Sequence, residues 1–257
     1  MNFTKTLFNM LVLLSVASLA QASTVLFNFG GTTYAGINAP GHVDGAATGT
    51  TWNTLAVDTG SGILDENGAA TTVVVDFGTS AGGGTTVDYA GATKNADYDT
   101  YGGVNATIFQ TTLMEGNAVR DSGSLEGIAL NVSGLAAGSY EFYFTALRAE
   151  TSSNAVRTHN VFAGVAADAI TDFSSLSVGT LTNVGFGTAS TPWTEGTNYI
   201  KGQFTIDGTQ NFSLLTTSPD YIGVMSSLEI VAIPEASSLM LSLFAFVALG
   251  VCCRRKV

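Results

Sequence analysis

The sequence predicts an all-β fold, a single antiparallel β-sandwich. Apolar and polar side chains alternate along several short segments, most clearly where Tyr140, Phe142 and Phe144 would share one face of a strand. Turn-forming residues separate these segments, as at 65–68 and 81–84. The central part of the chain shows no apolar stripe at helical spacing over more than a turn or two, which argues against a parallel α/β architecture and leaves sandwich or barrel.

The expected strands share this two-residue period and run through 25–29, 71–77, 128–132, 140–145, 200–207, 212–215 and 224–231. No helix is expected after Gly82, Gly83 and Gly84, so these glycines are interpreted as turn residues and not as a phosphate-binding loop. The segments 90–103 and 151–158 are expected to be the irregular excursions of the domain.

The segment 132–140 indicates how two of these strands are joined. Its Leu135, Gly138 and Tyr140 resemble the Leu-x-x-Gly-x-Tyr corner of Greek-key sandwiches. In that corner the tyrosine hydroxyl binds the backbone a few residues upstream and pins a strand crossover. The alternative is that Tyr140 is a core aromatic with an exposed hydroxyl.

The N-terminal 22 residues are expected to be a secretory signal peptide. They carry one positive charge, at Lys5, followed by an apolar run over 7–19. The small residues Ala20 and Ala22 predict cleavage before Ser23. The alternative is an uncleaved anchor helix.

The C-terminal segment 233–257 begins with a Pro234-Glu235 step and ends in a basic cluster that contains Arg254 and Arg255. Between them, the uncharged residues 239–253 would form a helix of about 22 Å, shorter than the roughly 30 Å hydrocarbon core. Lys and Arg stay on the cytoplasmic side, so the basic cluster would orient this helix in the inner membrane.

This order of motif, apolar helix and basic end resembles the PEP-CTERM sorting tails of Gram-negative bacteria that make exopolysaccharide. The resemblance implies that an exosortase-type enzyme recognises the tail, cleaves near Pro234 and sends the protein to the cell surface or the extracellular matrix. Ala236 stands where the family pattern has a second proline, which puts processing in question. An ordinary C-terminal anchor is the alternative.

The remaining residues, 23–232, are expected to form one domain. Pieces at 25–30, 51–55, 64–68 and 198–202 look like those of the jelly-roll, galactose-binding-like sandwiches that often accompany such tails. This second resemblance is made of short, degenerate pieces, so it implies a fold more than a function.

Charge excludes one class of partner. Of nine Lys and Arg, four lie in the two terminal segments, which leaves five basic residues against 19 acids, about −14 for the domain. Such a surface repels phosphate backbones, so no nucleic-acid binding is expected. Both cysteines, Cys252 and Cys253, lie in the tail, so the domain has no disulfide.

The sequence lacks the usual signatures of catalysis. Neither His42 nor His159 has metal-ligand spacing, and no nucleophile elbow or phosphate-binding loop is present. Acids on the polar faces of expected strands, among them Glu141 and Glu229, are interpreted as solvated surface. A glycosidase needs two acids that meet in space, and no pair stands out, so we expect no enzyme activity.

Two kinds of binding residue can still be named. Asp97 and Asp99 alternate with other oxygen-bearing side chains, as in the start of a calcium loop, although the closing Glu is missing and a plain polar loop is the alternative. No other cofactor is expected. Trp52 with Asn53, and Trp193, lie in polar settings that suit stacking on a sugar ring, against the alternative of buried core tryptophans.

From these observations we expect an exported cell-surface or matrix protein with a structural or glycan-adhesive sandwich. Its expected partners are the exosortase-type enzyme and extracellular polysaccharide. The alternative is a secreted carbohydrate-active enzyme or its binding module.

Overall fold

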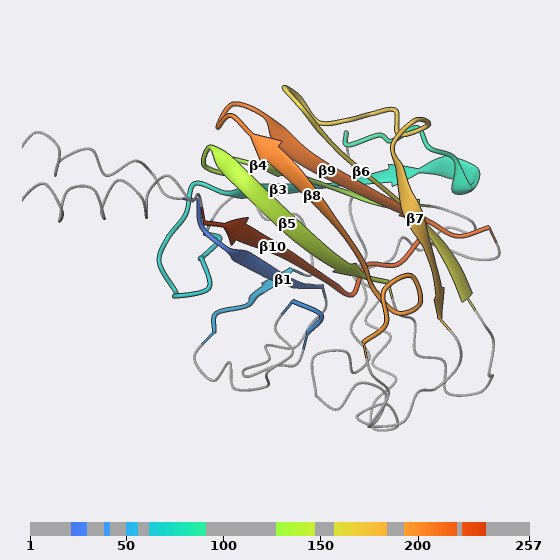
Figure 1. Cartoon of the computed structure of the whole chain (residues 1–257). Coiled ribbons are helices and arrows are strands. Elements are labelled where there is room, and N and C mark those ends of the chain that lie inside the picture. The colour runs from blue at the N-terminus through green and yellow to red at the C-terminus, as the bar shows by residue number, and fades with distance from the viewer. Residues whose placement is uncertain are drawn as a thin grey trace, which may run out of the picture.

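The described part of the chain consists of strands and connecting turns in two packed layers. A computed structural model describes residues 22–29, 39–41, 50–55, 62–90, 127–146, 157–183, 193–219 and 223–234. Within these ranges the only helical element is a single 3-10 turn, η1, over Ala81–Gly83. The expected all-β sandwich is therefore confirmed (Figure 1).

The first sheet has five strands in the order β2-β1-β10-β5-β8. All neighbours are antiparallel except β1 and β2, which are parallel. In Figure 1 this sheet is the layer nearer the viewer, with β8 in orange beside β5 in yellow-green. Its strands are β2 (Asn53–Leu55), β1 (Val25–Phe29), β10 (Ser227–Ile233), β5 (Gly138–Thr145) and β8 (Ile200–Ile206).

The second sheet, which lies behind the first in Figure 1, has the order β3-β4-β9-β6-β7 and is antiparallel throughout. The pairing of β6 with β7 shifts register between Val161 and Phe162, which indicates a bulge or irregularity there. The strands are β3 (Val74–Ser80), β4 (Gly127–Ser133), β9 (Asn211–Thr217), β6 (Arg157–Ala166) and β7 (Ser177–Asn183).

Eight of these strands pair in a nested order. When β2 and β3 are left out, the outermost two strands of the sequence pair with each other, then the next two, and so on inward. The resulting pairs are β1–β10, β4–β9, β5–β8 and β6–β7. This nesting places successive strands of the eight in alternate layers, except for β6 and β7, which are neighbours in the second sheet.

The core lies between the two sheets and is rich in aromatic rings. The alternation that the sequence shows in β5 holds, since Tyr140, Phe142 and Phe144 are at most 3% exposed. Phe204 and Phe212 stack across the layers with ring centroids 4.3 Å apart. Burying one large apolar side chain contributes about 1.5–3 kcal/mol, so such a core can stabilise the domain without disulfides.

The outer face of the second sheet carries a smaller core of its own. Val87 and Phe173, from the connections after β3 and after β6, are buried against Ala129 and Leu215 of the sheet. The two connections are joined by backbone hydrogen bonds, including one of 2.8 Å from the Val87 amide to the Thr171 carbonyl. The two connections therefore cover the outer face of the second sheet around Ala129 and Leu215.

Some expectations about strand bounds were wrong. The expected strand at 71–77 is Val74–Ser80, and the strand expected to begin at 224 begins at Ser227. The excursion expected over 151–158 ends earlier, because β6 already begins at Arg157. Three strands, β2, β6 and β7, were not predicted.

The expected signal peptide and sorting tail lie almost wholly outside the described residues, which begin at Ala22 and end at Pro234. Within the described ranges, no helix has the length and apolar character of a membrane span. Ala22 packs against the main core, and the Ala232 amide donates a 3.1 Å hydrogen bond to the Thr24 hydroxyl. The two described ends therefore lie beside each other on the first sheet.

Candidate functional site

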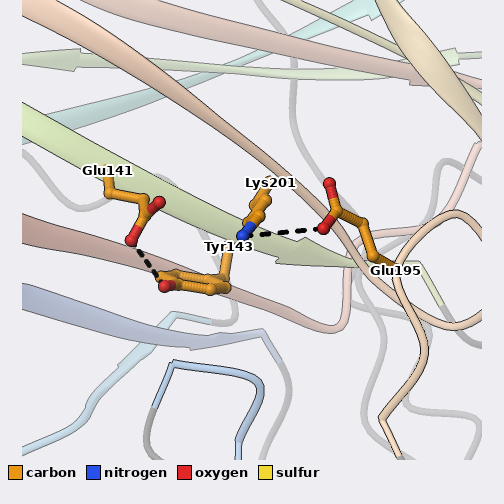
Figure 2. A network of polar contacts seen from close by, with 4 residues as sticks. All are labelled: Glu141, Tyr143, Glu195 and Lys201. Carbon is orange, nitrogen blue, oxygen red and sulfur yellow. Dashed lines mark hydrogen bonds and ion pairs between the residues drawn. The ribbon is translucent and has the colours of Figure 1, made fainter.

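The outward face of the first sheet carries a cluster of polar and aromatic side chains. Strand register places Glu229 of β10, Tyr143 of β5 and Lys201 of β8 opposite one another in one row across the sheet. Residues in such a row lie on the same face and within contact distance of their neighbours. Figure 2 shows Tyr143 and Lys201 together with Glu141 and Glu195.

Tyr143 and Glu141 form the centre of this cluster. The Tyr143 hydroxyl donates a hydrogen bond of 2.5 Å to Oε2 of Glu141, and both residues are half-buried (Figure 2). Burial, followed by the hydrogen bond and charge of Glu141, raises the pKa of the Tyr143 hydroxyl. The phenol therefore stays protonated at neutral pH, and the carboxylate has capacity to accept a further hydrogen bond from a ligand hydroxyl.

An exposed ion pair lies next to Tyr143. The Lys201 ammonium is 3.6 Å from Oε2 of Glu195, and these side chains are 40% and 48% exposed. A pair this exposed contributes little to folding stability, because water and salt screen it. Its effect is to place one cation and one anion at the surface beside the aromatic rings.

Two further aromatic rings, those of Tyr199 and Trp193, follow Tyr143 toward the turn that precedes β8. The Tyr143 and Tyr199 centroids are 6.1 Å apart, and those of Tyr199 and Trp193 are 6.3 Å apart with nearly perpendicular planes. All three side chains are half-buried, so each keeps part of its surface in contact with solvent. We call Trp193, Tyr199 and Tyr143 the aromatic cluster.

The turn that carries Trp193 and Tyr199 is held by its own hydrogen bonds. The Thr194 amide donates to the Asn198 side chain at 2.7 Å, and the Gly196 amide donates to the Tyr199 carbonyl at 2.8 Å. Gly196 has a φ of 76°, a left-handed conformation that glycine adopts without strain. These bonds hold the backbone of the turn from which the Trp193 and Tyr199 side chains project.

Glu229, expected to be solvated, is instead 0% exposed, so that expectation was wrong. The backbone amide of Gly41 donates a 3.0 Å hydrogen bond to its Oε1. Gly41 lies so close that a Cβ there would be 2.6 Å from Oε2 of Glu229 and 2.9 Å from the Tyr143 ring. The sequence holds no local signal for this cover, because Gly41 and Glu229 are 188 residues apart.

The residues named from the sequence as glycan contacts separate into two groups. Trp193 joins the aromatic cluster, but Trp52 is only 6% exposed and Asn53 is 9% exposed. The Asn53 side chain donates to the carbonyls of Leu26 at 3.1 Å and Leu64 at 2.8 Å and accepts from the Leu64 amide at 2.9 Å. The Trp52 ring is buried and the Asn53 amide is bound to backbone, so neither offers a surface to a sugar. The expectation that Trp52 and Asn53 contact a glycan was wrong.

The other named residues are mostly outside the described ranges: Ala20, Asp97, Asp99, Glu235, Arg254 and Arg255. Ser23 lies just before β1, and Pro234 is exposed directly after β10. Among the described residues, no three His, Cys, Asp or Glu side chains are grouped closely enough to hold a metal ion.

No protein-family model and no curated protein sequence matches the chain. Three solved structures show partial similarity. A family 35 carbohydrate binding module from Clostridium thermocellum is 16% identical, with a TM-score of 0.30 over 51% of this chain and 86% of that one. A 4-O-methyl-α-glucuronidase with specificity for decorated arabinogalactans is 10% identical, with a TM-score of 0.28 over 47% of this chain. An exo-β-1,3-galactanase from Phanerochaete chrysosporium is 13% identical, with a TM-score of 0.27 over 45%.

This chain covers only 15% of the glucuronidase and 23% of the galactanase. Similarity at these TM-scores carries no argument about function. What the domain does has to be inferred from its own residues, and the aromatic cluster with its polar neighbours is the surface that they single out.

Proposed function

We propose that the chain is an exported protein whose sandwich binds extracellular glycan at the outer face of the first sheet. The observation that carries this proposal is the contiguous aromatic cluster of Trp193, Tyr199 and Tyr143, edged by Glu141 and Lys201. Ring faces suit the C–H faces of sugars, and a few fixed donors and acceptors beside them can bind hydroxyls.

Binding is favoured over hydrolysis by the burial of one carboxylate. Glu141 and Glu229 lie on neighbouring strands at diagonal positions, because Tyr143 pairs with Glu229 and Glu141 pairs with Val231. Two such acids could serve a glycosidase. Glu229, however, is fully buried under Gly41, so a sugar has no access to it.

Delivery of this surface to the outside of the cell is the second part of the proposal. The segment 233–257 is proposed as an exosortase-type sorting tail and 1–22 as a signal peptide. The exposed position of Pro234 directly after β10 supports the first of these, because a processing enzyme has to reach the backbone there.

Affinity electrophoresis of the domain 23–234 tests glycan binding. The panel consists of gels that contain laminarin, dextran, β-1,4-galactan, arabinogalactan or alginate. We expect at least one glycan to retard the domain, and Trp193→Ala to abolish the retardation while circular dichroism stays unchanged. Asp168→Asn, an exposed site in the connection after β6, is the control and should migrate as the parent domain does. Retardation by none of the glycans, or equal retardation of Trp193→Ala, would contradict the proposal.

A further inference from the structure

We infer that the bound glycan is a neutral linear chain that lies along β5 and β8, from the aromatic cluster to a strip of polar side chains on the same face. This inference rests on the proposed function and specifies the class of ligand and its direction. The strip consists of three cross-strand pairs that the register defines: Tyr143 with Lys201, Glu141 with Gln203, and Ser139 with Thr205.

The three pairs project from the same face because side chains two residues apart in a strand point the same way. Inward-facing residues alternate with them, as the burial of Tyr140, Phe142 and Ile206 shows. Successive pairs are about 6.7 Å apart, so the strip is about 13 Å long, which exceeds one pyranose ring and matches about three linked rings.

Each pair offers groups that suit sugar hydroxyls. Lys201 donates hydrogen bonds, Glu141 accepts them, and the Gln203 amide does both. The hydroxyls of Ser139 and Thr205 lie 3.3 Å apart and can each donate or accept. Lys201, Gln203 and Thr205 are exposed, so these side chains contribute little to the core and are available to a ligand.

The charge of the strip selects against acidic polymers. Its one ammonium, on Lys201, already pairs with Glu195, and Glu141 adds a second carboxylate. Glu229, buried on the neighbouring strand β10, lies beside Tyr143 in the same row. Among the described residues, a uronate chain would therefore meet more carboxylates than cations, whereas a neutral chain meets only donors and acceptors.

The two ends of this surface set the direction in which the glycan chain lies. Trp193 and Tyr199 lie at the end where β8 begins, and Ser139 and Thr205 lie toward the opposite end of the same two strands. A short oligosaccharide anchored on the aromatic cluster would not reach the Ser139–Thr205 pair, but a longer one would. Affinity should therefore rise with chain length up to about four units and then level off.

Isothermal titration with laminari-, dextran-derived and β-1,4-galacto-oligosaccharides of two to six units tests this inference. We expect Gln203→Ala to lower the affinity for the tetrasaccharide about fivefold and to leave the affinity for the disaccharide unchanged. Trp193→Ala should abolish binding of both lengths, and Asp168→Asn should bind as the parent domain does. Raising NaCl from 0.05 to 0.5 M should change the affinity by less than about twofold, because salt screens charge–charge attraction and a neutral ligand has none.

The possible results separate this inference from the proposed function. Three results would overturn the inference and leave the proposed function standing, provided that Trp193→Ala still abolishes binding. These are equal affinity for all lengths, no effect of Gln203→Ala, or binding that is restricted to alginate and weakened by salt. Absence of binding to every oligosaccharide and every polymer of the panel would overturn both.

Discussion

The hydroxyl of Tyr140 donates a hydrogen bond of 2.8 Å to the backbone carbonyl of Ala136. Ala136 lies in the connection between β4 of the second sheet and β5 of the first. The bond therefore fixes the chain where it crosses between layers, as the sequence motif predicted.

Replacing Tyr140 by Phe should destabilise the domain without changing its fold. The substitution keeps the ring in the core but removes the donor to Ala136, which costs about 0.5–1.5 kcal/mol. Urea denaturation should show a lower midpoint at an unchanged m-value. Ser139→Ala is the control, because it removes a half-buried hydroxyl next to the corner whose 3.3 Å contact is with Thr205 and not with the crossover. A loss as large as that of Tyr140→Phe would show that the corner bond has no special effect.

The buried tyrosines predict that the domain loses stability at alkaline pH. Burial raises the pKa of Tyr140 to about 12 and raises that of Tyr143 as well. Their ordinary pKa is about 10, so above that pH the unfolded chain binds fewer protons than the folded one and the free energy of unfolding falls. For Tyr140 the loss should start near pH 10 and end near pH 12.

Thermal melts between pH 7 and pH 12 measure this effect. Tyr140→Phe should be less stable than the parent at neutral pH but lose less stability on going to pH 12, because its ring cannot ionise. Parallel slopes for the two proteins above pH 10 would count against the shifted pKa of Tyr140.

The sequence predicted most of this fold because apolar alternation is a local property. The strand at 25–29 was predicted with the bounds observed for β1, and the corner at Tyr140 was found from its neighbours alone. β6 and β7 were missed because Ala163, Gly164 and Gly179 interrupt the alternation with small residues of low strand propensity. Their place in the sheet comes from pairing with β9 and with each other, which a local pattern does not contain.

The candidate site was less predictable than the fold. Trp193 could be named from its polar setting, but the sequence does not tell that Tyr143 lies beside Tyr199, because that contact depends on the register of β5 with β8. The burial of Glu229 depends on a cover from Gly41 at the other end of the chain. Contacts of this kind arise from tertiary packing.

Two glycines with positive φ should differ sharply in their response to alanine. Gly134 has a φ of 73°, and a Cβ there would be 2.1 Å from the Thr72 carbonyl oxygen. Gly82 has a φ of 61° but nothing within 4 Å of the added Cβ. Gly82→Ala should cost about 1–2 kcal/mol for the left-handed conformation alone. Gly134→Ala should cost clearly more, because the backbone at the start of the β4–β5 connection has to move. Equal midpoints in urea would refute this difference.

The last prediction concerns the end of β10, where the mature protein should terminate near Pro234. β10 lies between β1 and β5, and its final residue, Ile233, pairs with Ser139. A protease that binds extended backbone cannot cut inside this central strand unless the sheet opens, so the first accessible bond follows Pro234. Proline has a fixed φ and no amide hydrogen, which disfavours helix at the preceding residue and keeps the junction extended. Cleavage there would remove Arg254 and Arg255 with the tail and leave all ten described strands intact.

Intact-mass analysis of the surface-located protein from the producing bacterium should therefore give a C terminus at or just after Pro234. An Arg254→Gln, Arg255→Gln variant should accumulate unprocessed, because the basic end that orients the tail is weakened. A surface-located parent protein that still ends at Val257 would show that the tail is a plain anchor.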